Sequence, residues 1–263
     1  WLFDSLDKRA FAVVNIDDRN GQVMVQNCRG RVRTLSLRSL ADYRCKVVEM
    51  GFEGMQLELD GCEFWSRLTG GFNAYNILGV YAAAVELGLD KTEVLTALSA
   101  LGSVDGRFET VRSKSGITAI VDYAHTPDAL ENVLSTINAI RTDDHQLIAV
   151  VGCGGDRDAT KRPEMARIAA DGASLVILTS DNPRTEDPEA ILAQMREGLR
   201  DGDRYLTIVR REEAIRTAAM LAAPGDIILL AGKGHETYQI IGTEKHHFDD
   251  REQISKAFET LQK

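Results

Sequence analysis

Short apolar runs alternate with amphipathic stretches along the second half of the chain. The apolar runs are rich in Val, Ile and Leu, as is typical of strands buried on both faces of a parallel sheet. The stretches between them repeat apolar residues at helical spacing, so we expect crossover helices. The pattern predicts a doubly wound, mostly parallel α/β sheet with strands at residues 118–121, 147–151, 175–179, 206–209 and 227–231 and helices at 127–140, 162–170, 188–199 and 212–222.

The first half of the chain has a different pattern. An apolar run at residues 11–16 predicts a buried strand, and alternation between residues 46 and 67 predicts an antiparallel hairpin. Two helices are expected next, at residues 72–87 and 91–101. Residues 102–107 contain two glycines and a serine and show no periodicity, so they form the best domain boundary.

Composition restricts the classes of function. With 263 residues, 44% hydrophobic and 27% charged, the chain is a globular protein of one large domain or two ordinary ones. No apolar run approaches the roughly 20 residues that span a bilayer, so we expect no membrane insertion, and the net charge of -9 argues against nucleic-acid partners and anionic membrane surfaces. The four cysteines, Cys28, Cys45, Cys62 and Cys153, lack metal-type spacing, so we expect reduced thiols in the cytoplasm and no metal site.

The tetrapeptide Asp181-Asn182-Pro183-Arg184 follows one of the expected parallel strands. Pro183 fixes its own φ and favours a turn, which places Arg184 just beyond the carboxyl end of the strand. Open α/β sheets bind their ligands there, and a forked guanidinium suits a carboxylate or a phosphate. The simpler interpretation of the tetrapeptide alone is that Asp181 and Arg184 pair across a surface turn.

Three further loops are expected at the same edge of the sheet. Residues 122–128, 152–158 and 232–236 each combine Gly or Pro with acidic and basic side chains, as a polar ligand held between loops requires. Gly152 and Gly154 give a weak dinucleotide signal, because Arg157 replaces the third glycine of that fingerprint. An NAD-dependent oxidoreductase is therefore a weak rival.

Several polar residues are ambiguous when taken singly. Asn73 and Asn76 lie three residues apart, so both could hold a base or ribose edge, although capping of the helix is the simpler interpretation. His125 alone is more typical of a packed or helix-capping histidine than of a catalytic one. Lys233 lacks the surrounding sequence of a phosphate-binding loop, so a cradle for ATP phosphates must come from elsewhere.

Seven short motifs occur in one order along nearly the whole chain, and together they are far more specific than any one of them. They are AVVNIDD (12–18), GGFNAYN (70–76), GRFE (106–109), DYAHTPDAL (122–130), GCGGDRD (152–158), DNPR (181–184) and GKGHE (232–236). With these motifs the chain resembles the Mur ligase family, and within it the diaminopimelate-adding ligases.

The resemblance implies a partial central ATPase domain, residues 1–106, followed by a carboxyl-terminal, amino-acid-binding Rossmann-like domain, residues 107–263. It also implies ATP and Mg²⁺ as cofactors. The family's uridine-nucleotide domain and phosphate loop lie outside this sequence, and its carbamylated, magnesium-associated lysine would fall immediately before Trp1. We therefore expect this segment alone to be inactive, and no catalytic residue or metal ligand is assigned within it.

The resemblance also assigns binding residues. Those implied for ATP are Asn73, Asn76, Arg107, Asp122, Tyr123 and His125. Those implied for the incoming amino acid are Arg157, Asp181, Asn182, Pro183, Arg184, Gly232 and Glu236.

The implied enzyme is an ADP-forming amide ligase of peptidoglycan precursor synthesis, acting as a monomer. It adds meso-diaminopimelate to UDP-N-acetylmuramoyl-L-alanyl-D-glutamate through an acyl phosphate. Diaminopimelate differs from lysine by one carboxylate, which Arg184 would match. At about 1.5–3 kcal/mol for each charged hydrogen bond, two such bonds would discriminate by roughly 10²–10⁴. A lysine-adding ligase and a noncatalytic amino-acid-binding protein derived from ligase domains are the alternatives.

Overall fold

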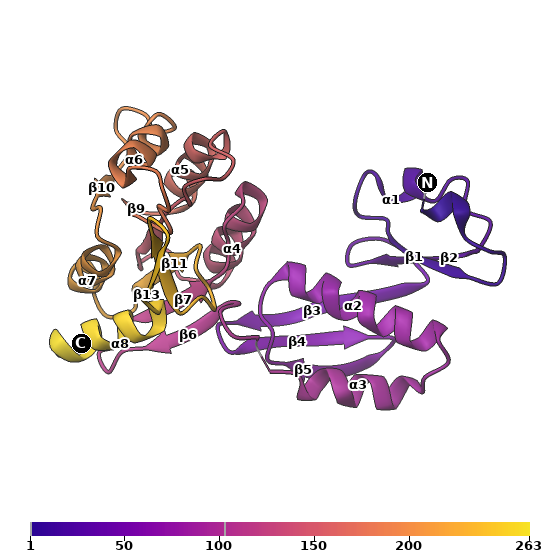
Figure 1. The fold of residues 1–263 in the computed structure, drawn as a ribbon. Helices are drawn as coiled ribbons and strands as arrows, with labels where there is room; N and C mark the ends of the chain where they lie inside the picture. Colours follow the sequence, from indigo (N-terminus) through magenta and orange to yellow (C-terminus); the bar gives the residue numbers. More distant parts are fainter. Residues whose placement is uncertain (1, 103) are drawn as a thin grey trace. The chain divides into compact units, whose positions relative to one another are not determined.

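The computed structural model describes residues 2–102 and 104–263, which belong to two compact units, residues 1–102 and 103–263 (Figure 1). Trp1 and Ser103 lie outside the described residues, and Ser103 is part of the expected boundary segment. Within the described ranges, no helix is both long enough and apolar enough to cross a membrane.

The first unit is built on a five-stranded mixed sheet in the order β1-β2-β3-β4-β5. Its strands β1 (Phe11–Asn15), β2 (Arg31–Ser36) and β3 (Tyr43–Gly51) are parallel, whereas β4 (Gly54–Leu59) and β5 (Cys62–Ser66) continue as an antiparallel meander. The predicted first strand and the predicted hairpin are confirmed. The sequence pattern missed β2, because its first four residues are only partly buried or exposed.

Two helices cover this sheet, and both were predicted. Helix α2 (Gly71–Glu86) packs against β3, and α3 (Lys91–Ala100) packs against β5. Asp90 caps α3 by accepting hydrogen bonds from the backbone N–H groups of Thr92 and Glu93. Buried side chains of β4, including Leu57 and Leu59, form the core with those of the helices. The short helices η1 (Phe3–Ser5) and α1 (Gly21–Met24) precede β2.

The second unit contains a six-stranded sheet in the order β10-β9-β8-β11-β7-β6. Five strands are parallel: β7 (Thr118–Asp122), β8 (Leu147–Val151), β9 (Leu175–Leu178), β10 (Tyr205–Thr207) and β11 (Ile227–Ala231). The edge strand β6 (Glu109–Arg112) is antiparallel to β7 and was not predicted. Strand β10 begins and ends earlier than expected. It lies at the other edge of the sheet, where β9 is its only partner among the described residues.

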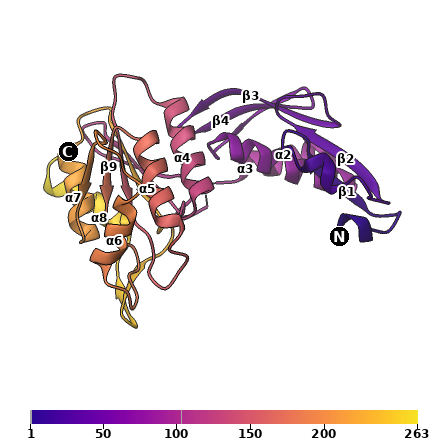
Figure 2. The same ribbon diagram turned by 90° about the horizontal axis from the view of Figure 1, so that it is seen from above.

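Helices lie on both faces of this sheet, which confirms the predicted doubly wound α/β fold (Figure 2). Helices α4 (Pro127–Ile140), α5 (Lys161–Gly172) and α6 (Pro188–Arg196) follow one another, and α5 packs on β8 and β9. Helices α7 (Arg211–Leu221) and α8 (Asp250–Thr260) pack on the opposite face of the sheet. There they form a hydrophobic core with alternate side chains of the strands, such as Ile148, Val150 and Leu230.

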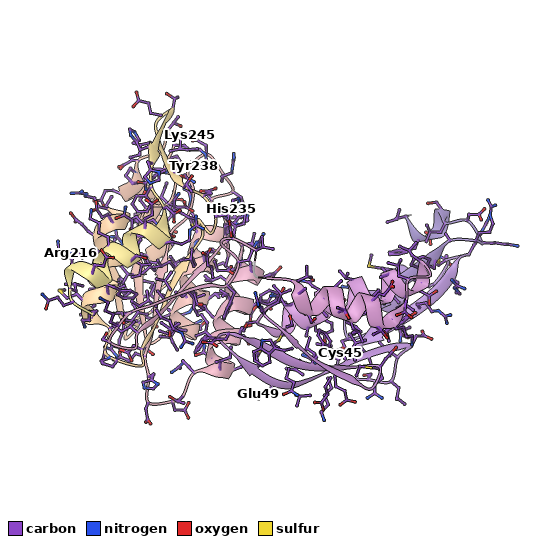
Figure 3. The ribbon with its side chains drawn as sticks, turned by 90° about the horizontal axis from the view of Figure 1, so that it is seen from below. Cys45, Glu49, Arg216, His235, Tyr238 and Lys245 are labelled. Atoms are coloured by element: carbon purple, nitrogen blue, oxygen red, sulfur yellow. The ribbon has the colours of Figure 1, made fainter. Side chains whose placement is uncertain are left out.

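A small antiparallel hairpin lies between β11 and α8 along the chain. It consists of β12 (Tyr238–Ile241) and β13 (Glu244–His247), joined through Gly242, whose φ is +61°. Tyr238 and Lys245 face each other on this hairpin, with the ammonium nitrogen 4.2 Å from the ring centroid (Figure 3). The sequence analysis predicted neither this hairpin nor α8.

Candidate functional site

Four polar loops of the second unit begin at the same edge of its sheet. The register aligns Ala231 with Asp122 on one side and with Val151 on the other, and Val151 is aligned in turn with Leu178. The loops that follow these residues are therefore neighbours, as predicted for the carboxyl edge of a parallel sheet. Gly232 N–H donates to the Asp122 carbonyl at 3.0 Å, which joins two of the loops directly.

Arg184 is held in place at both its backbone and its side chain. Its N–H donates to the Ile240 carbonyl at 3.1 Å, and its carbonyl accepts from Gly242 N–H at 2.7 Å. Its Nη1 donates to the Gly155 carbonyl at 2.8 Å. Its φ of +52° lies in the left-handed region, which is uncommon for a residue with a side chain. The hairpin therefore fixes the point from which this guanidinium projects.

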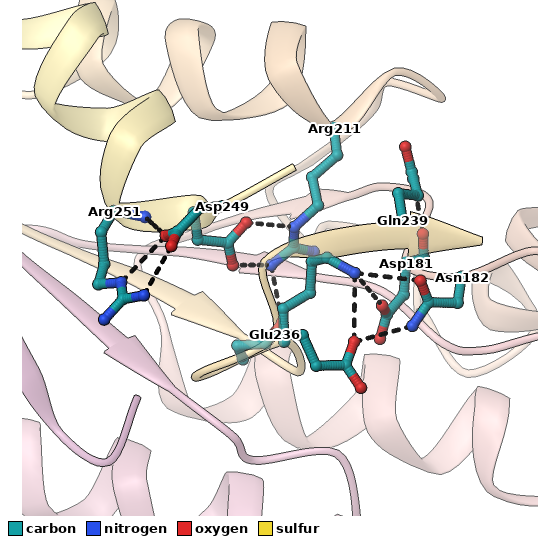
Figure 4. Close-up of polar contacts among 10 residues, drawn as sticks. Asp181, Asn182, Arg211, Glu236, Gln239, Asp249 and Arg251 are labelled. Carbon is teal, nitrogen blue, oxygen red and sulfur yellow. Dashed lines mark hydrogen bonds and ion pairs between the residues drawn. The ribbon is translucent and has the colours of Figure 1, made fainter. Parts of the chain in front are cut away.

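The carboxylate of Asp181 contacts Lys233 rather than Arg184. Lys233 Nζ lies 3.3 Å from Asp181 Oδ1 within a buried cluster (Figure 4). Both Asp181 and Asn182 are buried, at 7% and 4% relative exposure. The interpretation of the tetrapeptide as an ion pair across a surface turn is therefore wrong.

The loop after β8 is glycine-rich because it approaches the DNPR loop closely. Gly155 N–H donates to the Asn182 carbonyl at 2.9 Å, and a Cβ on Gly155 would lie 1.9 Å from the Pro183 carbonyl oxygen. Arg162, at 1% relative exposure, donates to both carboxylate oxygens of Glu186 at 2.8 Å. These contacts hold the two loops together. Close packing of the backbone therefore explains why this loop contains glycines, without a bound dinucleotide.

Arg157 lies in the same loop but is exposed. Its Nη1 donates to the carbonyl of the preceding residue, Asp156, at 3.2 Å. Of the residues assigned to the amino acid, Asp181, Asn182 and Glu236 meet at Lys233, and Gly232 lies beside Asp181. A Cβ on Gly232 would lie 3.1 Å from Asp181 Oδ2.

A second group of residues surrounds Tyr123. Its ring centroid lies 4.5 Å from that of His125 and 5.1 Å from that of His235, and the guanidinium carbon of Arg107 lies 5.1 Å from it. Cationic and aromatic groups of this kind suit the base or phosphates of a nucleotide. His125 is exposed, and its Nδ1–H donates to the carbonyl of Tyr123 at 2.8 Å, while Thr126 caps the following helix, so His125 is neither a packed nor a helix-capping histidine.

Asp122 begins the same loop and is buried. Burial raises the pKa of its carboxyl group, although its Oδ2 accepts a hydrogen bond from Phe108 N–H at 2.8 Å. Gly106, next to Arg107, packs so closely on the backbone of Gly234 and His235 that a Cβ would lie 1.9 Å from His235 N. The residues assigned to ATP in this unit therefore form one packed group with the GKGHE loop.

Comparison with known proteins decides the family. Residues 1–84 match the family model of the Mur ligase middle domain, and residues 106–234 match that of the Mur ligase glutamate ligase domain. The UDP-N-acetylmuramoyl-L-alanyl-D-glutamate–2,6-diaminopimelate ligase of Cytophaga hutchinsonii is 52% identical over 264 residues, which cover 100% of this chain and 54% of that protein. The chain belongs to the Mur ligase family.

Solved structures agree with this placement. A structure of a UDP-N-acetylmuramoyl-L-alanyl-D-glutamate–2,6-diaminopimelate ligase is 40% identical, with a TM-score of 0.64, over 96% of this chain and 54% of that one. A MurF ligase from Thermotoga maritima in complex with ADP shares the fold at 19% identity and a TM-score of 0.65, over 99% of this chain and 55% of that one. The chain thus spans about half the length of the Mur ligases that it matches.

The two asparagines assigned to ATP lie in the first two turns of α2, in the first unit. Asn73 Nδ2 donates to the Thr69 carbonyl at 2.8 Å, and Asn76 Nδ2 lies 3.3 Å from Asn73 Oδ1. The cap position is Gly70, which has no side chain, so the capping interpretation is wrong. Asn76 is exposed, and its assignment to ATP stays a prediction.

Sequence reasoning missed the buried cations of this Mur ligase unit. Lys233 was noted only for its lack of a phosphate-loop context, whereas it contacts Asp181, Asn182 and Glu236, which the family resemblance assigns to the amino acid. Arg211 and Arg162 received no role. The useful signal was position, because Lys233 lies two residues after a fully apolar strand, at the carboxyl edge of the sheet.

Across residues 2–102 and 104–263, no group of three or more His, Cys, Asp or Glu side chains is placed to hold a metal ion.

Proposed function

We propose that this chain is the amino-acid-binding part, and a share of the ATP-binding part, of an ADP-forming ligase. The ligase adds meso-diaminopimelate to UDP-N-acetylmuramoyl-L-alanyl-D-glutamate. The observation that carries the proposal is the placement of Arg184, whose backbone is clamped by β12 and whose loop joins the buried Lys233 cluster. The names of the relatives at 52% and 40% identity support the choice of reaction.

The chemistry fits the residues at this edge. A carboxylate is a poor acyl donor until ATP converts it to an acyl phosphate, after which an amine can attack and release phosphate. The protein's part is to hold that amine in line with the reacting carbon, so positioning of the amino acid supplies much of the rate. In this proposal Arg184 binds the far carboxylate of diaminopimelate, while Asp181, Gly232 and Glu236 define the rest of the pocket.

The residues around Tyr123 are proposed to contact ATP. Arg107 supplies a cation for phosphate oxygens, and Tyr123 with His125 supplies an aromatic surface. Asp122 is placed for a ribose hydroxyl, and Asn73 and Asn76 are assigned to the nucleotide by the family resemblance. The ADP complex of the Thermotoga MurF ligase supports a nucleotide on this fold.

The experiment is calorimetric titration of the chain with meso-diaminopimelate and with L-lysine. We expect diaminopimelate to bind and lysine to bind roughly 10²–10⁴ times more weakly, because lysine leaves the Arg184 guanidinium unpaired. Arg184→Ala should remove the preference. Arg216→Ala, an exposed arginine on α7, is the matched control and should retain it (Figure 3). Equal binding of both amino acids would refute the specificity, and binding of neither would refute the proposed site.

A further inference from the structure

The ammonium group of Lys233 is buried and contacts polar side chains of two loops. The residue has 0% relative exposure, and its Nζ lies 3.1 Å from Asn182 Oδ1, 3.3 Å from Asp181 Oδ1 and 3.3 Å from Glu236 Oε2. A lysine ammonium has three N–H donors, so these three acceptors use all of them. Lys233 therefore has no donor left for a ligand and instead joins groups of the protein to one another.

Asn182 completes this network. Its Oδ1 accepts from Lys233 and also from Ile240 N–H at 2.9 Å, and its Nδ2 donates to Glu236 Oε2 at 2.9 Å. The Asn182 side chain thus uses both lone pairs of its oxygen and one of its two N–H groups in hydrogen bonds to protein atoms. Gln239 adds a further link, because its Nε2 donates to the Asp181 carbonyl at 2.6 Å (Figure 4).

The network joins the loop after β9 to the loop after β11. Asp181 and Asn182 immediately precede Pro183 and Arg184, while Glu236 lies three residues beyond Lys233. Without the ammonium, the carboxylates of Asp181 and Glu236 would lie close together with no cation between them, and they would repel each other. The relative positions of the two loops thus depend on a residue that has no donor available for substrate.

We propose that Lys233 is a positioning residue that sets the spacing between Arg184 and Glu236 in the amino-acid site, with Asn182 as its main relay. This inference rests on the proposed function of that site. It separates the residues of the DNPR loop by role: Arg184 presents its guanidinium to the ligand, whereas the Asn182 side chain mainly holds the two loops together. Lys233 acts on the ligand through these residues and does not touch it.

The test compares Lys233→Met with the wild-type chain by hydrogen exchange and by calorimetry. We expect amide exchange to accelerate at residues 182–185 and 236–241, where the loops lose their common anchor, while the strands of the sheet stay protected. Diaminopimelate affinity should fall at least roughly tenfold. Should the methionine variant fail to fold, Lys233→Gln, which keeps two N–H donors, takes its place.

A matched control separates positioning from general stability. Arg167→Met removes two ion pairs of the same unit, to Asp171 and Asp203, that lie outside the loops at this edge. It should lower the melting temperature without changing exchange at residues 182–185 or diaminopimelate affinity. Equal effects of both variants on these loops would overturn the proposal.

A double-mutant cycle tests the route through Asn182. If Lys233 acts through Asn182, Lys233→Met should weaken diaminopimelate binding much less in an Asn182→Ala background than in the wild-type chain. If the effects of the two substitutions on diaminopimelate affinity are fully additive, Lys233 does not act through Asn182. If the wild-type chain binds no diaminopimelate, the proposed function fails, but local exchange in Lys233→Met still decides whether Lys233 sets the spacing of the loops.

Discussion

Arg211 and Asp250 form a fully buried, bidentate ion pair near the carboxyl edge of the second unit's sheet. Arg211 Nη2 lies 2.6 Å from Asp250 Oδ2 and Nε lies 2.8 Å from Asp250 Oδ1, and both side chains have 0% exposure (Figure 4). Arg211 Nη2 also donates to the Ala231 carbonyl at 3.1 Å. The pair thus ties α7 and α8 to the last residue of β11, immediately before Gly232.

Arg211→Met should lower the free energy of unfolding by roughly 3–5 kcal/mol, because it leaves the Asp250 carboxylate buried without its cation. The double variant Arg211→Met/Asp250→Leu should recover much of that loss, since no unpaired charge remains. Urea unfolding followed by circular dichroism measures both. A double variant no more stable than the single one would contradict this account of the pair.

Arg184 combines a backbone in the left-handed region with a side chain that we propose binds the substrate, so two substitutions can separate the two contributions. Arg184→Ala and Arg184→Gly both remove the guanidinium and should both abolish diaminopimelate selectivity. The glycine variant should be about 1 kcal/mol more stable than the alanine variant, because φ is +52° and glycine adopts that conformation freely. Equal melting curves for the two variants would show that the backbone at this position is not strained.

Gly106 and Gly116 provide a matched pair for testing close packing behind the nucleotide residues. Both have positive φ, +67° and +92°, but a Cβ would lie 1.9 Å from His235 N at Gly106 and would have open space at Gly116. Gly116→Ala should cost roughly 1–3 kcal/mol through its backbone conformation alone. Gly106→Ala should cost clearly more, because the backbone of the GKGHE loop must move. Chemical denaturation of both variants measures the two losses in free energy of unfolding. Equal losses would contradict a role for close packing at Gly106.

His247 at the end of β13 lies 2.6 Å from Glu252 in α8, measured from Nε2 to Oε2. The Glu252 carboxylate raises the pKa of His247 above its usual 6.5. Because the folded pKa is the higher one, the stabilisation from this pair is fully present below about pH 6.5 and is lost as pH rises through the raised value. Proton NMR titration of His247 should show the elevated pKa. Glu252→Gln should return it toward 6.5, and Glu244→Gln should not.

The central strands of the second unit were predictable because they are apolar on both faces. Residues 147–151 and 227–231 were predicted with the bounds that the structure shows, since complete burial leaves an uninterrupted apolar run. The edge strand Glu109–Arg112 and the hairpin residues 238–247 were missed for the opposite reason. They are exposed or half-buried along much of their length, so their sequence carries little periodic signal.

The candidate site was predictable only in part. The position of Arg184 beyond a parallel strand followed from sequence order and the turn at Pro183, both of which are local. Its anchoring by Ile240 and Gly242 was not predictable, because those residues lie more than fifty positions away in a hairpin that the sequence pattern did not predict. The alternative interpretation, an Asp181–Arg184 pair across a surface turn, failed for the same reason, because the carboxylate of Asp181 pairs with the distant Lys233.

The sequence by itself determined the alternation of strands and helices, the loops at the carboxyl edge and the family to which the chain belongs. These depend on hydrophobic periodicity, turn residues and ordered motifs, which are properties of the chain read locally. Tertiary structure alone decided which charges are paired inside. Lys233 meets Asp181 and Arg211 meets Asp250 because the fold brings residues that are distant in the chain into water-free contact, where an unpaired charge is unfavourable.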